Sequence, residues 1–193
     1  LDRTYGGTVW TRGAVHDWLK AISPHYVVDI TSDTQLQDSY AGTPHNLVVG
    51  VARIGGTDFR YKLYTWDGNA YRRTGRIDTS LPILFKPMGK PEPEATYIAS
   101  DADYVDLITE LMGGFSIPPE VKTLRQGKQY LLLGLRLQRD TERMVLSDVI
   151  YAAAEPAGWA LIKAPTDKER RFCTKRGIVL VEADVFDLIK GDI

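Results

Sequence analysis

The chain has 193 residues, of which 44% are hydrophobic and 25% are charged. These fractions are typical of a soluble globular domain and unlike those of disordered, collagenous or membrane proteins. The 24 Lys and Arg residues against 25 Asp and Glu residues leave a net charge of -1, which disfavours binding of nucleic acid through its phosphates. We therefore expect one compact domain over residues 1–193, with no nucleic-acid partner.

The cysteine and histidine content limits the chemistry of the chain. A single cysteine, Cys173, excludes an internal disulfide and a zinc site of four cysteines, and His16, His25 and His45 lack the spacing of metal ligands. No apolar run approaches the roughly 20 residues that span a bilayer, and no export signal is visible. We expect no metal, no membrane contact and a cytoplasmic location. Because the sequence begins at Leu1, it can also be a trimmed piece of a longer chain.

Short apolar runs alternate with helical patterns along the chain. Near-continuous apolarity is typical of strands buried on both faces of a parallel sheet. The alternation of such strands with helices predicts a layered α/β fold with a mostly parallel sheet. In chain order we expect a helix at 13–22, strands at 26–30, 46–50 and 83–86, a helix at 101–112, a strand at 130–135, a helix at 140–154, strands at 159–162 and 178–181, and a helix at 184–190.

The stretch 51–84 has a different pattern. Residues 59–66 (FRYKLYTW) alternate apolar and polar side chains and are followed by Asp67 and Gly68. Residues 70–73 are the expected return strand. A turn dipeptide between alternating runs predicts a β-hairpin. We therefore predict an antiparallel hairpin insertion between two parallel strands. Its aromatic side chains either anchor a partner or pack on the core, and they are Tyr61, Tyr64, Trp66 and Tyr71.

Polar residues follow two of the expected strands at their carboxyl ends, where ligands bind in α/β sheets. After the first strand come Thr31, Ser32 and Asp33, which can reach a ribose but can equally cap the next helix. The run 130–135 contains Gly134 and is followed by three arginines interspersed with acids. These arginines either meet phosphates or form a solvated helix start.

Other glycines and histidines favour a structural interpretation. His25 and His45 precede their strands, so we interpret them as structural or surface residues. The pair Gly6 and Gly7 follows no strand. The pair Gly113 and Gly114 follows a helix, where a helix stop is the expected role.

Five segments resemble, in order, motifs of bacterial sirtuin-like domains. Residues 26–33 (YVVDITSD) resemble the strand with the TTN-type motif, and 82–89 (PILFKPMG) resemble the K-L-H-G motif. Residues 95–107, 130–140 and 176–181 are similar to the later strands and helix of the family. Over about residues 14–190 the resemblance implies a Rossmann-like three-layer fold. It also implies that NAD or ADP-ribose contacts Thr31, Ser32, Asp33, Gly134, Arg136 and Asp140.

The departures from the family pattern concern catalysis. The position of the family's catalytic histidine holds Met88, which has no proton to exchange. The family's asparagine falls on Asp33 and a following aspartate falls on Gln35, so an amide is replaced by an acceptor-only carboxylate. No strand followed by a glycine-rich, pyrophosphate-binding turn precedes Tyr26. The resemblance therefore implies a catalytically degenerate domain that serves as a protein-interaction or nucleotide-sensing module.

Two other hypotheses remain open. A sirtuin-like NAD hydrolase or deacylase can use Asp33 as a non-standard catalytic carboxylate, because a carboxylate can stabilise an oxocarbenium-like centre. Loss of the first βα units would also uncover a sheet edge, and such edges are covered by self-association or by a partner. We accordingly expect a homodimer or a protein partner at the hairpin 59–73 or at an exposed sheet edge.

Overall fold

The computed structural model describes residues 8–52, 59–114 and 116–192. The chain divides into two compact units, Leu1–Pro118 and Pro119–Ile193. Both units combine helices with a β-sheet, which confirms the α/β class. A single domain over the whole chain stays a prediction.

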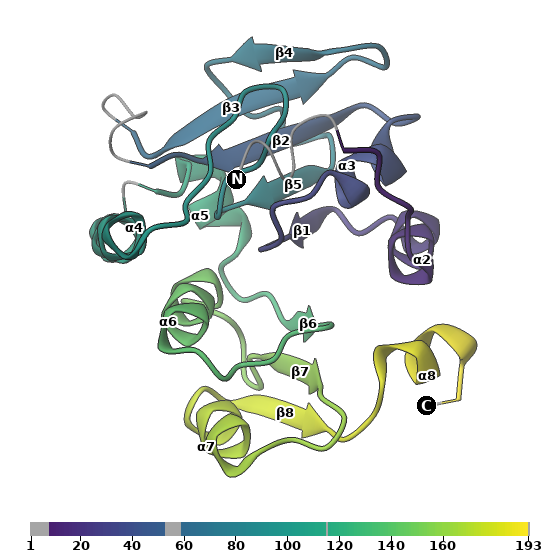
Figure 1. Ribbon diagram of the computed structural model, residues 1–193, viewed down its shortest axis with the longest axis vertical. Coiled ribbons are helices and arrows are strands. Elements are labelled where there is room, and N and C mark those ends of the chain that lie inside the picture. The colour runs from purple at the N-terminus through teal and green to yellow at the C-terminus, as the bar shows by residue number, and fades with distance from the viewer. Residues whose placement is uncertain (1–7, 53–58, 115, 193) are drawn as a thin grey trace. The chain divides into compact units, whose positions relative to one another are not determined.

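The first unit contains a five-stranded mixed sheet in the order β1-β5-β2-β3-β4, and Figure 1 shows the strands one above another with β4 at the top. Three strands are mutually parallel, and two form an antiparallel hairpin beside them. The hairpin therefore lies between two parallel strands in sequence, as predicted, although residues 53–58 of the stretch 51–84 lie outside the described residues. The strands are β1 (Tyr26–Val28), β2 (His45–Gly50), β3 (Tyr61–Trp66), β4 (Tyr71–Thr74) and β5 (Ile83–Lys86).

The core of the first unit is built on the two central strands, because every residue of β2 and β5 is buried. The helix α3 (Gln35–Tyr40) packs Leu36 and Tyr40 against this sheet, and Leu19 of α2 (Ala14–Ile22) joins the same cluster. Burying such side chains stabilises a fold by roughly 1.5–3 kcal/mol each. In the view of Figure 1, α2 and α3 lie to the right of the sheet and α4 lies to its left.

The helix α4 (Asp101–Gly113) has the ends that its sequence predicts. The hydroxyl oxygen of Ser100 accepts a hydrogen bond from the amide of Asp103, and the Asp103 carboxylate accepts one from the Ser100 amide. This reciprocal cap satisfies amides that lack partners in the first turn. The helix stop at the glycine pair is confirmed, because the C-cap residue Gly114 has a φ of 75°.

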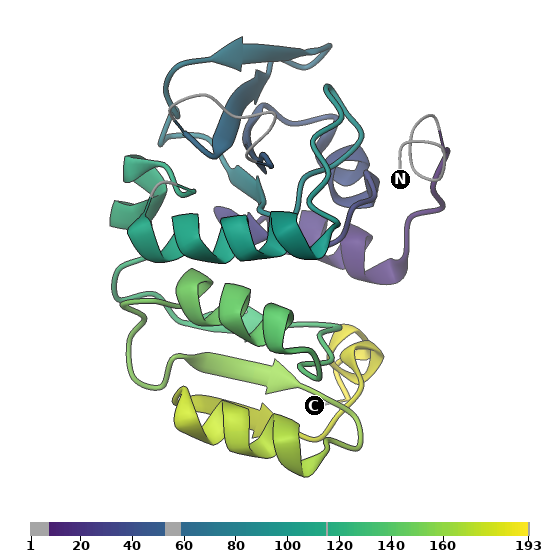
Figure 2. The same cartoon turned by 60° about the vertical axis from the view of Figure 1, so that its left-hand side comes forward.

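The second unit contains a three-stranded parallel sheet in the order β6-β7-β8, with α6 and α7 as the crossovers between its strands. Figure 2 shows these two helices running alongside the strands. Parallel neighbours need such connections because a tight turn can only join antiparallel strands. The elements are α5 (Pro119–Leu124), β6 (Tyr130–Leu132), α6 (Asp140–Val149), β7 (Gly158–Leu161), α7 (Asp167–Lys175), β8 (Ile178–Val181) and α8 (Val185–Lys190).

Several predicted boundaries in the second unit were wrong. The strand expected at 130–135 ends at Leu132, and Gly134, with a φ of 66°, turns the chain soon afterwards. The helix expected at 140–154 ends at Val149, since Ala152 has a left-handed φ of 60° that a helix does not contain. The helices α5 and α7 were not predicted.

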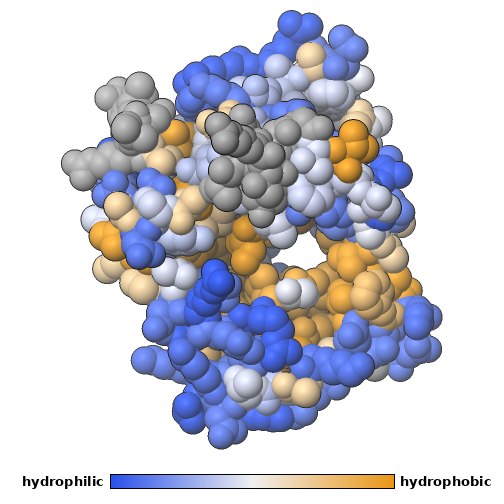
Figure 3. Space-filling model, viewed as in Figure 1, coloured by the Kyte–Doolittle hydropathy of each residue, from blue (hydrophilic) through white to orange (hydrophobic). Residues whose placement is uncertain are grey.

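In the part of the chain that the structure describes, β1 and β4 are the outer strands of the first sheet, and each has one edge without a neighbouring strand. On β4 the exposed residues are Arg72 and Arg73, and Figure 3 shows hydrophilic surface over the hairpin at the top of the view. Charged side chains on an edge strand discourage pairing with a second chain. Among the described residues, the helices are all too short or too polar to cross a membrane.

Candidate functional site

The carboxyl ends of β1, β5 and β2 lie at one edge of the first sheet, because these strands are parallel. The register places Val28 opposite Phe85, so the next residues, Asp29 and Lys86, are neighbours. The ammonium group of Lys86 lies 2.6 Å from Oδ2 of Asp29. The lysine side chain is fully buried, and the aspartate side chain is 12% exposed.

The Asp29 carboxylate is also bound by Thr31. The amide and the hydroxyl of Thr31 donate to Oδ1 of Asp29 at 2.9 and 2.8 Å. A buried charge is tolerated when it is both paired and hydrogen-bonded, and this carboxylate has three donors. The network ties the ends of β1 and β5 together and satisfies the Asp29 carboxylate.

The predicted site residue Asp33 caps the helix that follows it. Its Oδ1 accepts a hydrogen bond from the amide of Gln35 at 3.0 Å, at the start of α3. Carboxylates in this position satisfy amides of the first helical turn. The helix-capping interpretation is thus confirmed for Asp33, while Ser32 is half-buried and Thr31 is exposed at the same edge. A role of these three residues in ligand binding stays a prediction.

Met88, where the resemblance places a histidine, is buried with 8% exposure in the turn after β5. The Gly89 amide donates to the carbonyl of Lys86, and the Ile98 amide donates to the carbonyl of Met88. Gly89 has a φ of 75°, and a Cβ atom there would lie 1.9 Å from the carbonyl oxygen of Thr96. Only glycine fits this close approach, so the turn holds the thioether of Met88 in the core, where it is a packing group with no proton to transfer.

The turn leads into Lys90, which belongs to a set of polar side chains in the interior of the first unit. We call this set the Lys90 cluster, and it consists of Gln37, Tyr40, His45, Tyr71 and Lys90. His45 is fully buried, with Nδ1 2.8 Å from the carbonyl oxygen of Thr43 and Nε2 2.8 Å from the Tyr71 hydroxyl. Burial lowers the pKa of His45. These bonds confirm the structural interpretation of His45, which packs edge-on against Tyr40 at 5.9 Å between ring centroids.

Lys90 is the unusual member of the cluster. Its side chain is fully buried, and Nζ has no hydrogen-bond partner among the described residues. The nitrogen lies 5.3 Å from the centroid of the Tyr71 ring. Burial, with a smaller effect of the Lys86 charge, lowers the pKa of Lys90 to about 6, against the opposing effect of Glu92 and other acids.

The hairpin aromatics are used largely inside the first unit. Tyr64 is buried, and its hydroxyl donates to Glu94 at 2.9 Å. The indole of Trp66 donates to the carbonyl of Ala41 at 2.6 Å. With Tyr71 in the Lys90 cluster, packing on the core accounts for these three side chains. Phe59, by contrast, is 52% exposed and stacks on a neighbouring ring at the hairpin base.

The remaining predicted site residues lie in the second unit, after the carboxyl end of β6. The guanidinium of Arg136 donates to the carbonyl of Lys163 and forms an ion pair with the buried Glu169 at 3.2 Å. Asp140 is largely exposed and pairs with Arg143. The structure therefore places Gly134, Arg136 and Asp140 at one edge of this sheet, and it places the other three predicted residues in the first unit.

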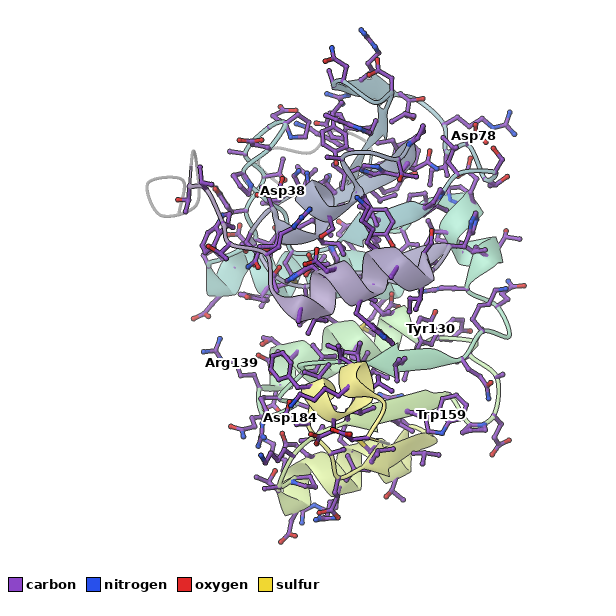
Figure 4. The ribbon with its side chains drawn as sticks, turned by 90° about the vertical axis from the view of Figure 1, so that its right-hand side faces the viewer. Asp38, Asp78, Tyr130, Arg139, Trp159 and Asp184 are labelled. Atoms are coloured by element: carbon purple, nitrogen blue, oxygen red, sulfur yellow. The ribbon has the colours of Figure 1, made fainter. Side chains whose placement is uncertain are left out.

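A cavity of about 420 Å³ lies in the second unit. It is formed where α6 and α7 end and β7 and β8 begin, which is the amino edge of the sheet. Figure 4 shows the two ends of this unit, with Arg139 and Asp184 at the carboxyl edge and Tyr130 and Trp159 at the other. The cavity is thus at the opposite edge from the predicted binding segment. Its lining includes Ser147, Tyr151, Glu155, Lys175 and Arg176.

Within the described residues, no group of three or more His, Cys, Asp or Glu side chains has an arrangement that would hold a metal ion. Comparison with known proteins finds no matching family model, no matching curated protein and no matching solved structure.

Sequence reasoning missed Asp29, Lys86 and Lys90 as features of the site. Asp29 and Lys86 are the charged residues within two otherwise apolar strand segments, 26–30 and 83–86. Opposite charges at the ends of two apolar strands are a signal for a buried ion pair only once the two strands are known to be neighbours. Lys90 had no comparable signal, because it follows a proline and a glycine in a segment typical of an exposed loop.

Proposed function

We propose that the chain is a catalytically degenerate sirtuin-like domain with a Rossmann-like three-layer arrangement, which binds an adenine nucleotide such as NAD or ADP-ribose without cleaving it. The observation that carries the proposal is the burial of Met88 in the turn after β5. Cleavage of the bond between nicotinamide and ribose depends on a group that polarises a ribose hydroxyl. A thioether offers neither a proton nor a basic site for that step.

The carboxylates at the same edge are engaged by the protein itself. Asp29 receives three donors from Lys86 and Thr31, and Asp33 caps α3. These bonds serve the fold, because they hold the end of β1 and the start of α3 in place. Binding of a nucleotide needs hydrogen-bonding groups but no proton transfer. The hydroxyls of Thr31 and Ser32 at the end of a parallel strand are suited to a ribose.

The test is a calorimetric titration with NAD and with ADP-ribose, combined with an assay for nicotinamide release. We expect both ligands to bind with similar affinity, since the shared adenosine diphosphate ribose part makes the contacts. We expect release no faster than in a protein-free blank. Ser32→Ala should weaken binding, and Ser80→Ala, an exposed serine in a loop of the same unit, is the matched control.

Each other result has a definite meaning. Nicotinamide release above the blank would overturn the proposal that the domain is catalytically degenerate. Loss of this release in Asp33→Asn would favour the NAD-cleaving alternative. The absence of heat with either ligand would overturn nucleotide binding and favour a protein-interaction module. Homodimerisation through the hairpin 59–73 or a sheet edge is a separate proposal. A monomeric mass in light scattering at several concentrations would contradict it.

A further inference from the structure

The ammonium group of a lysine is strongly hydrated, so its burial without a partner is strongly unfavourable. Lys90 is nevertheless fully buried, and Nζ forms no hydrogen bond or ion pair within the described residues. The nearby cation, Lys86, is already held by Asp29. The Tyr71 ring, 5.3 Å from Nζ, is the contact among the described residues that would favour a charge there. One ring face replaces little of the lost hydration, so the arrangement favours a neutral amine.

The charged and titratable groups around Lys90 have opposing effects on its pKa. Lys86 on β5 and burial favour the neutral amine, whereas Glu92, Asp38 and Asp29 favour the ammonium form, and the balance lowers the pKa to about 6. His45 and Tyr71 also face the amine, and burial acts on the pKa of each. At pH 7 to 8 most molecules thus carry an unprotonated amine at this position, whereas an ordinary lysine has a pKa near 10.4.

An unprotonated amine is a nucleophile, but only a small and uncharged reagent can reach a side chain without solvent exposure. Carbon dioxide meets both conditions. The lone pair of Nζ forms a bond to its carbon, one C=O π pair moves onto oxygen, and the amine releases one proton to solvent. The product is a carbamate with one negative charge, and the step needs no oxidant, reductant or further reactant.

Two buried hydroxyls in the same part of the first unit are suited to a carbamate. The buried hydroxyls of Tyr40 and Thr96 have no hydrogen-bond partner among the described residues. Thr96 lies beside the lysine in the fold, because its amide donates to the Lys90 carbonyl at 3.0 Å, and Tyr40 belongs to the same cluster. A buried hydroxyl without a partner destabilises the fold, and an anionic carbamate that accepted a hydrogen bond from either hydroxyl would relieve this cost.

We propose that Lys90 is a carbamylation site, at which the buried amine binds carbon dioxide reversibly as a covalent carbamate. The test treats the full chain with ¹³C-bicarbonate at pH 8, traps carbamates as ethyl esters with triethyloxonium, and maps the modified peptides by mass spectrometry. We expect the adduct at Lys90 to exceed that at Lys62 at least tenfold. Lys62 is the matched control because its side chain is also largely buried but is ion-paired with Glu94 at 2.6 Å.

The ¹³C NMR spectrum of the chain in ¹³C-bicarbonate, before any trapping reagent is added, gives a second readout. A carbamate signal that is present in the wild-type chain and lost in Lys90→Arg would support the same conclusion. The peptide map of the wild-type chain decides the question even if that variant fails to fold. A folded chain in which Lys90 is no more modified than Lys62 would overturn the proposal. None of these results depends on whether the chain binds NAD or ADP-ribose.

Discussion

The Nζ atom of Lys86 lies 2.6 Å from Oδ2 of Asp29, and these residues are separated by 57 positions in the sequence. The pair joins the carboxyl ends of β5 and β1, the two strands that border the candidate site. Because the lysine is fully buried, removal of its partner leaves a charge inside the protein. The stability of the first unit should therefore depend unequally on the two residues.

We expect Asp29→Asn to lower the free energy of unfolding by about 3–5 kcal/mol, the cost of leaving a buried charge unpaired. Lys86→Met should cost less, because methionine fills the apolar space and Asp29 keeps the two donors of Thr31. Urea denaturation with linear extrapolation measures both. Asp67→Asn, in an exposed pair with Arg72, is the control and should cost much less. Equal losses for Asp29→Asn and Asp67→Asn would contradict a buried pair.

Tyr71→Phe should destabilise the chain by about 1–3 kcal/mol, since it removes the hydroxyl that lies 2.8 Å from Nε2 of the fully buried His45. Tyr151→Phe removes a hydroxyl from a side chain that is 66% exposed and should change stability by less than about 0.5 kcal/mol. Chemical denaturation of both variants at the same pH makes the comparison. If the two substitutions had the same effect, the hydrogen bond within the Lys90 cluster would not contribute to stability.

The predictions of the fold succeeded where local sequence determines local structure. The dipeptide Asp67–Gly68 predicted the hairpin, and the apolar runs predicted β2, β5 and β8. The helix α7 was missed because its buried residues are few, Glu169 and Cys173, and the rest of the helix is mostly charged. Its capping box, in which Thr166 and Glu169 bind each other's amides, was the available signal.

The predictions of the candidate site were limited by strand register. Position after a strand predicted that Thr31 to Asp33 lie at the carboxyl edge of the first sheet, and they do, whereas their contact with a ligand stays a prediction. The Asp29–Lys86 pair requires knowing that β1 and β5 are neighbours, and the intervening segment offers other partners. Lys90 is buried beside Tyr71 of β4, which is distant in the sequence. The residues next to Lys90 in the sequence therefore give no indication of its burial.

Gly89→Ala should be among the most damaging substitutions in the first unit, with a loss above about 3 kcal/mol. The new Cβ would lie 1.9 Å from the Thr96 carbonyl oxygen, and the φ of 75° adds strain. Gly68→Ala is the matched control, since Gly68 has a φ of 99° but open space around it, and only the strain of about 1–2 kcal/mol applies. The melting temperatures of the two variants test this. A tolerated Gly89→Ala would show that the segment of Thr96 is not held against this turn.

Lys90 should make the stability of the chain depend on pH. Burial lowers its pKa in the folded chain from 10.5 to about 6. Between these values the unfolded chain binds a proton that the folded chain does not, so unfolding takes up a proton and stability falls as the pH falls from 10 towards 6. Below about pH 6 both states are protonated and the loss is complete. Lys90→Met removes this difference in proton binding.

The variant should therefore gain stability relative to the wild-type chain as the pH falls, by up to about 1.4 kcal/mol for each pH unit within that range. Urea denaturation of both proteins at intervals from pH 6.5 to 9.5, in buffers freed of carbon dioxide, gives the difference directly. Taking the difference cancels the titration of other groups that the two chains share. A difference that does not change with pH would mean that Lys90 is equally protonated in the folded and unfolded chains, and the neutral amine on which carbamylation depends would then be excluded.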